Sequence, residues 1–124
     1  MRKKRRNVIP EAYLSLVPKH PEMLRWSTDK DGIVTFEIEN KGIMKRITQV
    51  LFFKPKVSYV HLDRFGSFIW QQIDGKRTIT EIGELVESEF GEEAHPLRER
   101  LATYFKILES YKFIDYKEHA AMEE

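Results

Sequence analysis

Hydrophobic residues recur at two different spacings along this chain, and the spacing changes near its middle. Within residues 33–39, apolar and polar side chains alternate from Val34 onward, which is typical of a strand with one buried face. Residues 23–28 also have the pattern of a strand, and a turn sequence, Asp29-Lys30-Asp31-Gly32, separates the two segments. The pattern therefore predicts a β-hairpin with one buried face.

A short helix and a further strand are predicted after the hairpin. Residues 43–53 carry apolar side chains at helical spacing, and Pro55 prevents the helix from continuing. The run Val57–Leu62 contains β-branched and aromatic residues and ends at Asp63, a residue type that caps helices well. We therefore expect an amphipathic helix, a compact strand and then a helix start.

Three helices are predicted in the rest of the chain, over about 64–73, 78–90 and 96–111. Asp74-Gly75 ends the first helix, and a capping box, Thr78-x-x-Glu81, begins the second, which stops at Gly91. Pro96 suits the first position of the third helix. A small antiparallel sheet followed by three helices predicts an α+β, winged-helix-like domain.

Composition divides the chain into three parts. Residues 1–21 hold three prolines and the basic run Arg2–Arg6, and we expect an extended, partly mobile segment there. Residues 22–116 are expected to form the folded domain, followed by a flexible tail at 117–124. The chain has no run of about 18 apolar residues, and no apolar stretch follows its basic start as in a secretion signal. These features predict a cytoplasmic protein.

The sequence offers little for catalysis. It contains no cysteine, which excludes disulfides, thiolate zinc sites and a cysteine nucleophile. Its four histidines are scattered, and neither a metalloprotease motif nor a glycine-rich phosphate loop accompanies them. We therefore expect a protein that is not an enzyme and that holds no cofactor or metal.

Charge is unevenly distributed, and this bears on nucleic-acid binding. A winged helix often reads DNA with its third helix, but residues 78–124 hold five basic and twelve acidic residues. A DNA-binding surface should instead neutralise phosphates. The basic run Arg2–Arg6 and the basic stretch 41–56 could bind RNA without sequence preference. A winged-helix regulator that binds nucleic acid therefore stays the second hypothesis.

The third predicted helix is apolar over a wider arc than packing on one side requires. The centre of its stripe is formed by Leu97, Leu101 and Leu108, and Phe105 extends one flank. The other flank carries Arg100, Tyr104, Ile107 and Tyr111. This surplus predicts the wall of a peptide-binding groove, unless the first strands or the two tryptophans, Trp26 and Trp70, cover it as ordinary core.

The strand Val57–Leu62 is the second candidate feature. If its outer edge is open, the backbone N–H and C=O groups there can accept an added strand from a peptide. The alternative is that residues 33–39 already occupy that edge. A third possibility is that the same edge joins two copies of the chain in a homodimer.

Several of these segments together resemble the PqqD-like family, also called the RiPP recognition element. The segments that carry the resemblance are His61-Leu62-Asp63-Arg64-Phe65-Gly66-Ser67-Phe68-Ile69-Trp70, Ile73-Asp74-Gly75-Lys76-Arg77-Thr78-Ile79, Glu81-Ile82 and the close from Leu108 to Ile114. The resemblance covers about residues 57–114, and residues 40–56 are similar to those of a stand-alone subgroup. The long amino-terminal segment and the insert at 43–53 depart from the family's pattern.

The resemblance implies a winged-helix-like domain that binds the leader of a ribosomally made precursor peptide as an added strand. The domain then delivers the peptide to a modifying enzyme, often a radical S-adenosylmethionine enzyme. The implied strand residues are Val57, Ser58, Tyr59, Val60, His61 and Leu62. The implied helical wall consists of Arg100, Leu101, Tyr104, Phe105, Ile107, Leu108 and Tyr111. Asp63 and Asp74-Gly75 would then be caps and turns.

Overall fold

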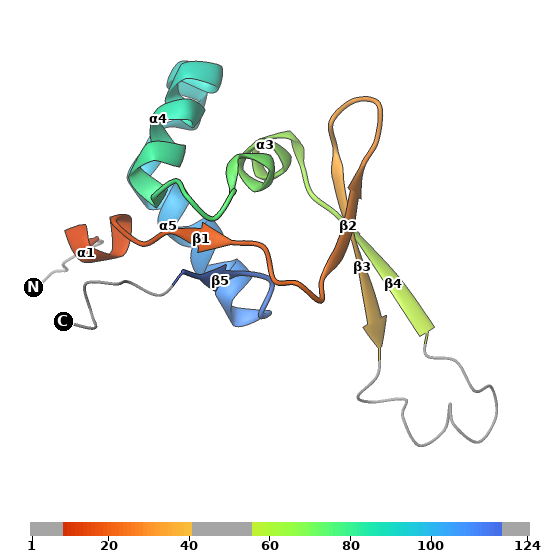
Figure 1. Cartoon of the computed structure of the whole chain (residues 1–124). Helices are drawn as coiled ribbons and strands as arrows, with labels where there is room; N and C mark the ends of the chain where they lie inside the picture. The colour runs from red at the N-terminus through yellow and green to blue at the C-terminus, as the bar shows by residue number, and fades with distance from the viewer. Residues whose placement is uncertain (1–8, 41–55, 118–124) are drawn as a thin grey trace, which may run out of the picture. The chain divides into compact units, whose positions relative to one another are not determined.

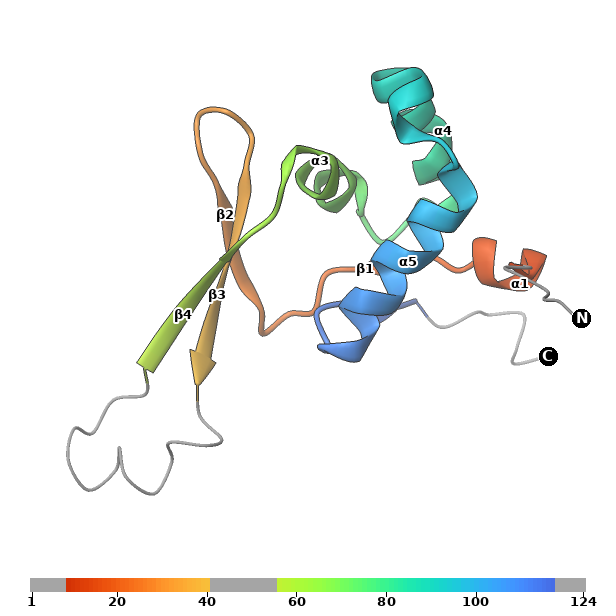
Figure 2. The same ribbon diagram turned by 180° about the vertical axis from the view of Figure 1, so that it is seen from behind.

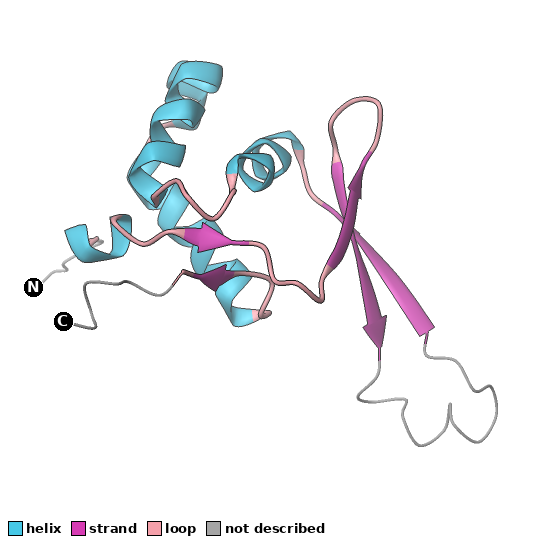
Figure 3. Ribbon diagram, viewed as in Figure 1, coloured by secondary structure: helices cyan, strands magenta, loops and turns pink. Residues whose placement is uncertain are grey.

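A computed structural model describes residues 9–40 and 56–117 of the chain (Figure 1). They belong to two compact units, one formed by residues 1–21 and 68–124 and the other by residues 22–67. Helices and strands both occur, with two antiparallel sheets, so the predicted α+β class is confirmed (Figure 3). The helix predicted over 43–53 falls outside the described residues.

The unit of residues 22–67 is built on a three-stranded antiparallel sheet in the order β2-β3-β4. Its strands are β2 (Arg25–Thr28), β3 (Val34–Asn40) and β4 (Lys56–His61). The turn between β2 and β3 is held by the Asp29 carboxylate, which accepts hydrogen bonds from the backbone N–H groups of Asp31 (2.8 Å) and Ile33 (3.0 Å). Gly32 has a φ of +82° there, a conformation that glycine adopts without strain. The predicted hairpin is therefore confirmed.

A buried hydroxyl completes the end of the ladder between β3 and β4. The Leu62 N–H donates to the Val34 carbonyl (2.9 Å), but the Val34 N–H donates to Oγ of Ser67 (2.8 Å). The Ser67 hydroxyl in turn donates to the Leu62 carbonyl (3.4 Å). The Ser67 hydroxyl thus links the Val34 N–H to the Leu62 carbonyl in place of a direct ladder hydrogen bond. Ser67 is only 2% exposed, so this link is shielded from water.

We expect Ser67→Ala to lower the free energy of unfolding by about 1–3 kcal/mol, because it leaves the buried Val34 N–H without its acceptor. Urea denaturation measures this loss. Ser110→Ala is the matched control, since Ser110 is an exposed serine whose hydroxyl donates to a carbonyl of its own helix. Its effect should stay within about 0.5 kcal/mol. Equal denaturation midpoints for the two variants would contradict this role of Ser67.

The helices begin and end close to the predicted positions (Figure 2). They are α3 (Arg64–Gln72), α4 (Ile79–Phe90) and α5 (Leu97–Ser110), with a 3-10 turn, η1 (Gly91–Ala94), after α4. Asp63 caps α3 by accepting the Gly66 N–H (2.7 Å), and Thr78 and Glu81 form both hydrogen bonds of the predicted capping box. Gly91 ends α4 with a φ of +59°. Pro96 lies at the N-cap of α5, one residue before the position predicted for it.

Residues 9–21, the described part of the amino-terminal segment, are more ordered than predicted. They contain a short helix, α1 (Glu11–Leu14), and a strand, β1 (Pro18–Lys19), that pairs antiparallel with β5 (Asp115–Tyr116). The hydroxyls of Tyr13 and Tyr116 both donate to the Glu109 carboxylate on α5. Burial raises the pKa of Tyr13 to about 12, so its hydroxyl stays a donor at neutral pH. These contacts fix α1 and β5 to α5.

Candidate functional site

β4 is an edge strand of its sheet. Its register with β3 pairs Phe36 with Val60 and Glu37 with Tyr59, and no described strand pairs with its other side. The predicted alternative, in which residues 33–39 fill the edge, is therefore true of one side of β4 only. A row of backbone donors and acceptors remains on the other side for an incoming strand.

The register identifies which backbone groups point outward. In an antiparallel ladder, hydrogen-bonded and non-hydrogen-bonded residue pairs alternate along the strand. The Leu62 N–H bonds to the Val34 carbonyl, so Val60 and Ser58 also direct their backbone groups toward β3. The N–H and C=O groups of Val57, Tyr59 and His61 consequently point away from β3. The sequence alone does not distinguish inward from outward backbone groups within residues 57–62, because the distinction depends on the register with β3.

The side chains of β4 leave apolar surface exposed. Tyr59 is 61% exposed, Val57 40% and Val60 38%. On the same face as Val57 and Tyr59, the His61 ring nitrogen Nδ1 lies 2.7 Å from the Thr35 hydroxyl oxygen, which orients the imidazole along the sheet. The edge therefore combines open main-chain groups with hydrophobic side chains, as peptide binding by strand addition requires.

The predicted helical wall divides into a buried and an exposed part. Leu101, Phe105 and Leu108 are at most 4% exposed, so they hold α5 within its own unit and offer no surface to a peptide. By contrast, Ile107 is 52% exposed and Tyr111 is 65% exposed. The apolar stripe of α5 is therefore wider than its core contacts need, as the sequence predicted.

Two further wall residues are half-buried and held in place. The Arg100 guanidinium donates to the Glu93 carbonyl, and the Tyr104 ring meets the Phe105 ring edge-on with centroids 5.3 Å apart. At the end of the helix, the Tyr111 ring stacks on Phe113 with a centroid distance of 5.5 Å. This flank of α5 presents aromatic and cationic side chains with restricted freedom, which lowers the entropic cost of binding. The edge of β4 belongs to the unit of residues 22–67 and the flank of α5 to the other unit, so they are two separate candidate surfaces.

Within residues 9–40 and 56–117, no group of three or more histidine or acidic side chains is arranged to hold a metal ion. In the same ranges, no helix has both the length and the apolar character needed to cross a membrane. The features that the structure does present are a strand edge and an exposed helix flank.

Comparison with the sequence models of known protein families gives a match. Residues 48–114 match the sequence model of a family described as "Coenzyme PQQ synthesis protein D (PqqD)". The matched region includes β4 and the helices α3, α4 and α5. No curated protein and no solved structure matches the chain.

Proposed function

The chain belongs to the PqqD family, and from this premise we propose that it binds the leader of a ribosomally made precursor peptide and presents it to the enzyme that modifies the peptide. Members of this family are non-catalytic accessory proteins. The role proposed for the chain is accordingly to bind a peptide and not to convert it.

The open edge of β4 is the observation that supports this proposal most strongly. The outward backbone groups of Val57, Tyr59 and His61 can pair with an extended peptide, whatever its side chains are. Exposed Val57 and Tyr59 would contact the peptide's side chains on one face of the enlarged sheet, and Val60 would do so on the other. Main-chain bonds then supply affinity, and these side chains supply selectivity.

The exposed flank of α5 is the second proposed contact. Tyrosine and arginine are enriched among the residues that dominate binding energies, and this flank carries Tyr104, Tyr111 and Arg100 beside the exposed Ile107. We propose it as a second, separate surface for the apolar side chains of a peptide. Leu101, Phe105 and Leu108 are left out of this contact set because they are buried.

The partner enzyme is proposed to be a radical S-adenosylmethionine enzyme, as the resemblance to the family implies, and the cytoplasm, predicted from the sequence pattern, is the proposed location. The winged-helix-like arrangement of the domain belongs to the same proposal. A short precursor gene next to a gene for such an enzyme, adjacent to the gene for this chain, would supply the peptide for the experiments.

Titration of that leader peptide into the full, isotope-labelled chain tests the proposal. We expect saturable changes in the amide signals of Val57, Tyr59 and His61 and of residues 104–111. No change at either surface with about 1 mM peptide would contradict it, since specific recognition requires a lower dissociation constant than that. Salt-sensitive binding of DNA or RNA without any peptide effect would favour the nucleic-acid hypothesis. A concentration-dependent dimer, in which the amide signals of these residues disappear without peptide, would favour self-association.

A further inference from the structure

A pocket of about 390 Å³ opens between α1, α4 and α5, all within the unit of residues 1–21 and 68–124. Its wall is largely apolar, with Leu14 from α1 and Leu97 and Leu101 from α5. Gly83 of α4 allows the Leu101 side chain of α5 to pack close to the α4 backbone, because a Cβ atom at this position would lie 2.9 Å from Cδ1 of Leu101. The pocket exists because α1 folds against α4, where the Thr80 hydroxyl donates to the Leu14 carbonyl (3.1 Å).

The pocket has an acidic border. Glu84 and Glu87 of α4 line it, and Glu84 forms no ion pair with any residue in the described part of the chain. Glu87 lies 2.8 Å from a ring nitrogen of His95. Across the pocket, the Arg98 guanidinium lies 3.4 Å from the Glu11 carboxylate at the start of α1. Residues 79–94 contain six acidic and no basic residues, so the α4 side of the pocket is strongly negative.

An apolar wall with a carboxylate border suits a lysine or arginine side chain. The aliphatic stem of such a side chain packs on apolar surface while its charged end stays at the water boundary. Leu97 is half-buried and supplies accessible apolar surface above the buried Leu14 and Leu101, and Glu84 and Glu87 supply the counter-charge. The pocket is open to solvent, so the ion pair itself would contribute modestly and the stem contacts would add to it.

The chain carries a segment of this chemistry shortly before α1 in the sequence. Arg2-Lys3-Lys4-Arg5-Arg6 is basic at every position, and it precedes α1 by only a few residues. Five residues of extended chain span up to about 17 Å, which is the reach from Glu11 back to Arg6. Because Glu11 already contacts the pocket-lining Arg98, this reach is sufficient. A short tether also gives the run an effective concentration on the order of millimolar at the pocket.

We propose that the chain's own basic run, Arg2–Arg6, docks at this pocket, with the stem of one lysine or arginine over Leu97 and its charged end at Glu84 and Glu87. This inference goes beyond peptide binding at β4 and does not depend on it. It gives the basic run a binding site within the same chain.

Amide spectra of the full chain test the proposal. In a variant with all five basic residues replaced by glutamine, we expect the signals of Thr80, Gly83 and Glu84 to move. Raising the salt from about 50 mM to about 0.5 M should move the same signals of the natural chain in the same direction, because salt screens exposed charges. The replaced residues precede the first described element, and circular dichroism checks that the variant keeps its fold.

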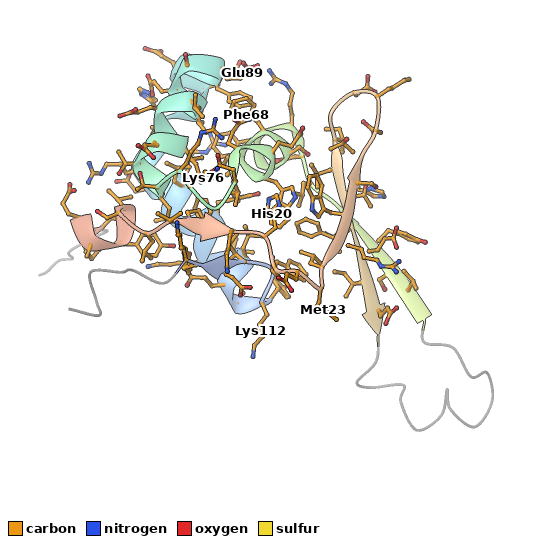
Figure 4. All side chains as sticks on the ribbon, in the orientation of Figure 1. His20, Met23, Phe68, Lys76, Glu89 and Lys112 are labelled. Atoms are coloured by element: carbon orange, nitrogen blue, oxygen red, sulfur yellow. The ribbon has the colours of Figure 1, made fainter. Side chains whose placement is uncertain are left out.

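Glu84→Gln should release the run and reproduce the shifts at Thr80 and Gly83. Glu89→Gln is the matched control, because Glu89 is an exposed glutamate of the same helix (Figure 4) that does not line the pocket. It lies nine residues beyond Thr80, about 14 Å along the helix axis, and it should leave these signals unchanged. Equal effects of the two substitutions would overturn the proposal.

A peptide with the sequence of residues 1–9 provides the final arm. Added to the five-glutamine variant, it should return the pocket signals to their natural positions, with an affinity roughly two- to fivefold weaker when Glu84 is also glutamine. Identical pocket signals in the natural chain and the five-glutamine variant would overturn the proposal. If the added peptide still bound in that case, the pocket would serve a basic segment of another protein instead.

Discussion

Replacing Tyr59 by proline should weaken binding of the precursor leader by about tenfold or more and leave the fold intact. Proline has no backbone N–H, and the N–H of Tyr59 points away from β3 toward the proposed peptide. One lost hydrogen bond and the clash of the proline ring together correspond to at least about 1.4 kcal/mol. Proline is tolerated on a strand edge when its nitrogen faces outward, so the sheet should persist. Calorimetric titration measures the affinity, and circular dichroism checks the fold.

Two neighbouring substitutions control this experiment. Tyr59→Ala keeps the donor and should cost less affinity than proline at the same position. Val60→Pro removes an N–H directed at β3 and should lower the stability of the sheet itself, so it probes the ladder and not the site. A folded Tyr59→Pro variant that binds the leader as tightly as the natural chain would contradict strand addition at this edge.

Phe105→Ala should lower the free energy of unfolding by about 3–5 kcal/mol, whereas Ile107→Ala should change it by less than about 0.5 kcal/mol. Both residues lie on α5, but Phe105 is fully buried and Ile107 is 52% exposed. Truncating Phe105 leaves a cavity in the core, and truncating Ile107 removes atoms that water already contacts. Thermal or urea denaturation of the two variants gives the comparison.

The same pair separates core from binding surface. Ile107→Ala, although neutral for stability, should weaken leader binding by about three- to tenfold, in the range of a typical interface residue. Lys106→Ala is a suitable control, since Lys106 is an exposed neighbour outside the proposed contact set. If Ile107→Ala and Lys106→Ala bind the leader equally well, the flank of α5 is not part of the site.

The elements that local chemistry determines were predictable from the sequence. The Thr78 and Glu81 side chains each accept the other residue's backbone N–H at the start of α4, and the Asp63 side chain accepts the Gly66 N–H at the start of α3. These caps act within one helical turn, so their effect is independent of the rest of the chain. The alternation from Val34 onward likewise identified the strand β3 and its buried face, on which Val34 and Phe36 lie. These predictions rested on interactions between residues close in sequence.

Elements held by distant partners were not predictable in the same way. α1 has only four residues and β1 only two, too few for a periodic pattern. They are ordered by contacts with Glu109, Thr80 and β5, which lie far along the chain. The pocket that α1 completes was therefore invisible in the sequence.

The candidate site was predictable in outline but not in detail. Spacing identified the wide stripe of α5 and placed its centre at Leu97, Leu101 and Leu108. The structure buries Leu101 and Leu108, but it also buries Ala102 and Phe105 on one flank and leaves Ile107 exposed on the other. Which side of a helix packs inward depends on its neighbours, and spacing alone does not specify them.

Hydrogen exchange at the individual amides of β4, measured in the full chain with and without saturating leader peptide, tests strand addition most directly. We expect exchange at Val57, Tyr59 and His61 to slow by about tenfold or more when the peptide is bound, because their outward N–H groups acquire acceptors. Exchange at Ser58 and Val60, whose N–H groups face β3, should change much less. Unchanged exchange at Val57, Tyr59 and His61 under saturating peptide would show that no strand is added at β4.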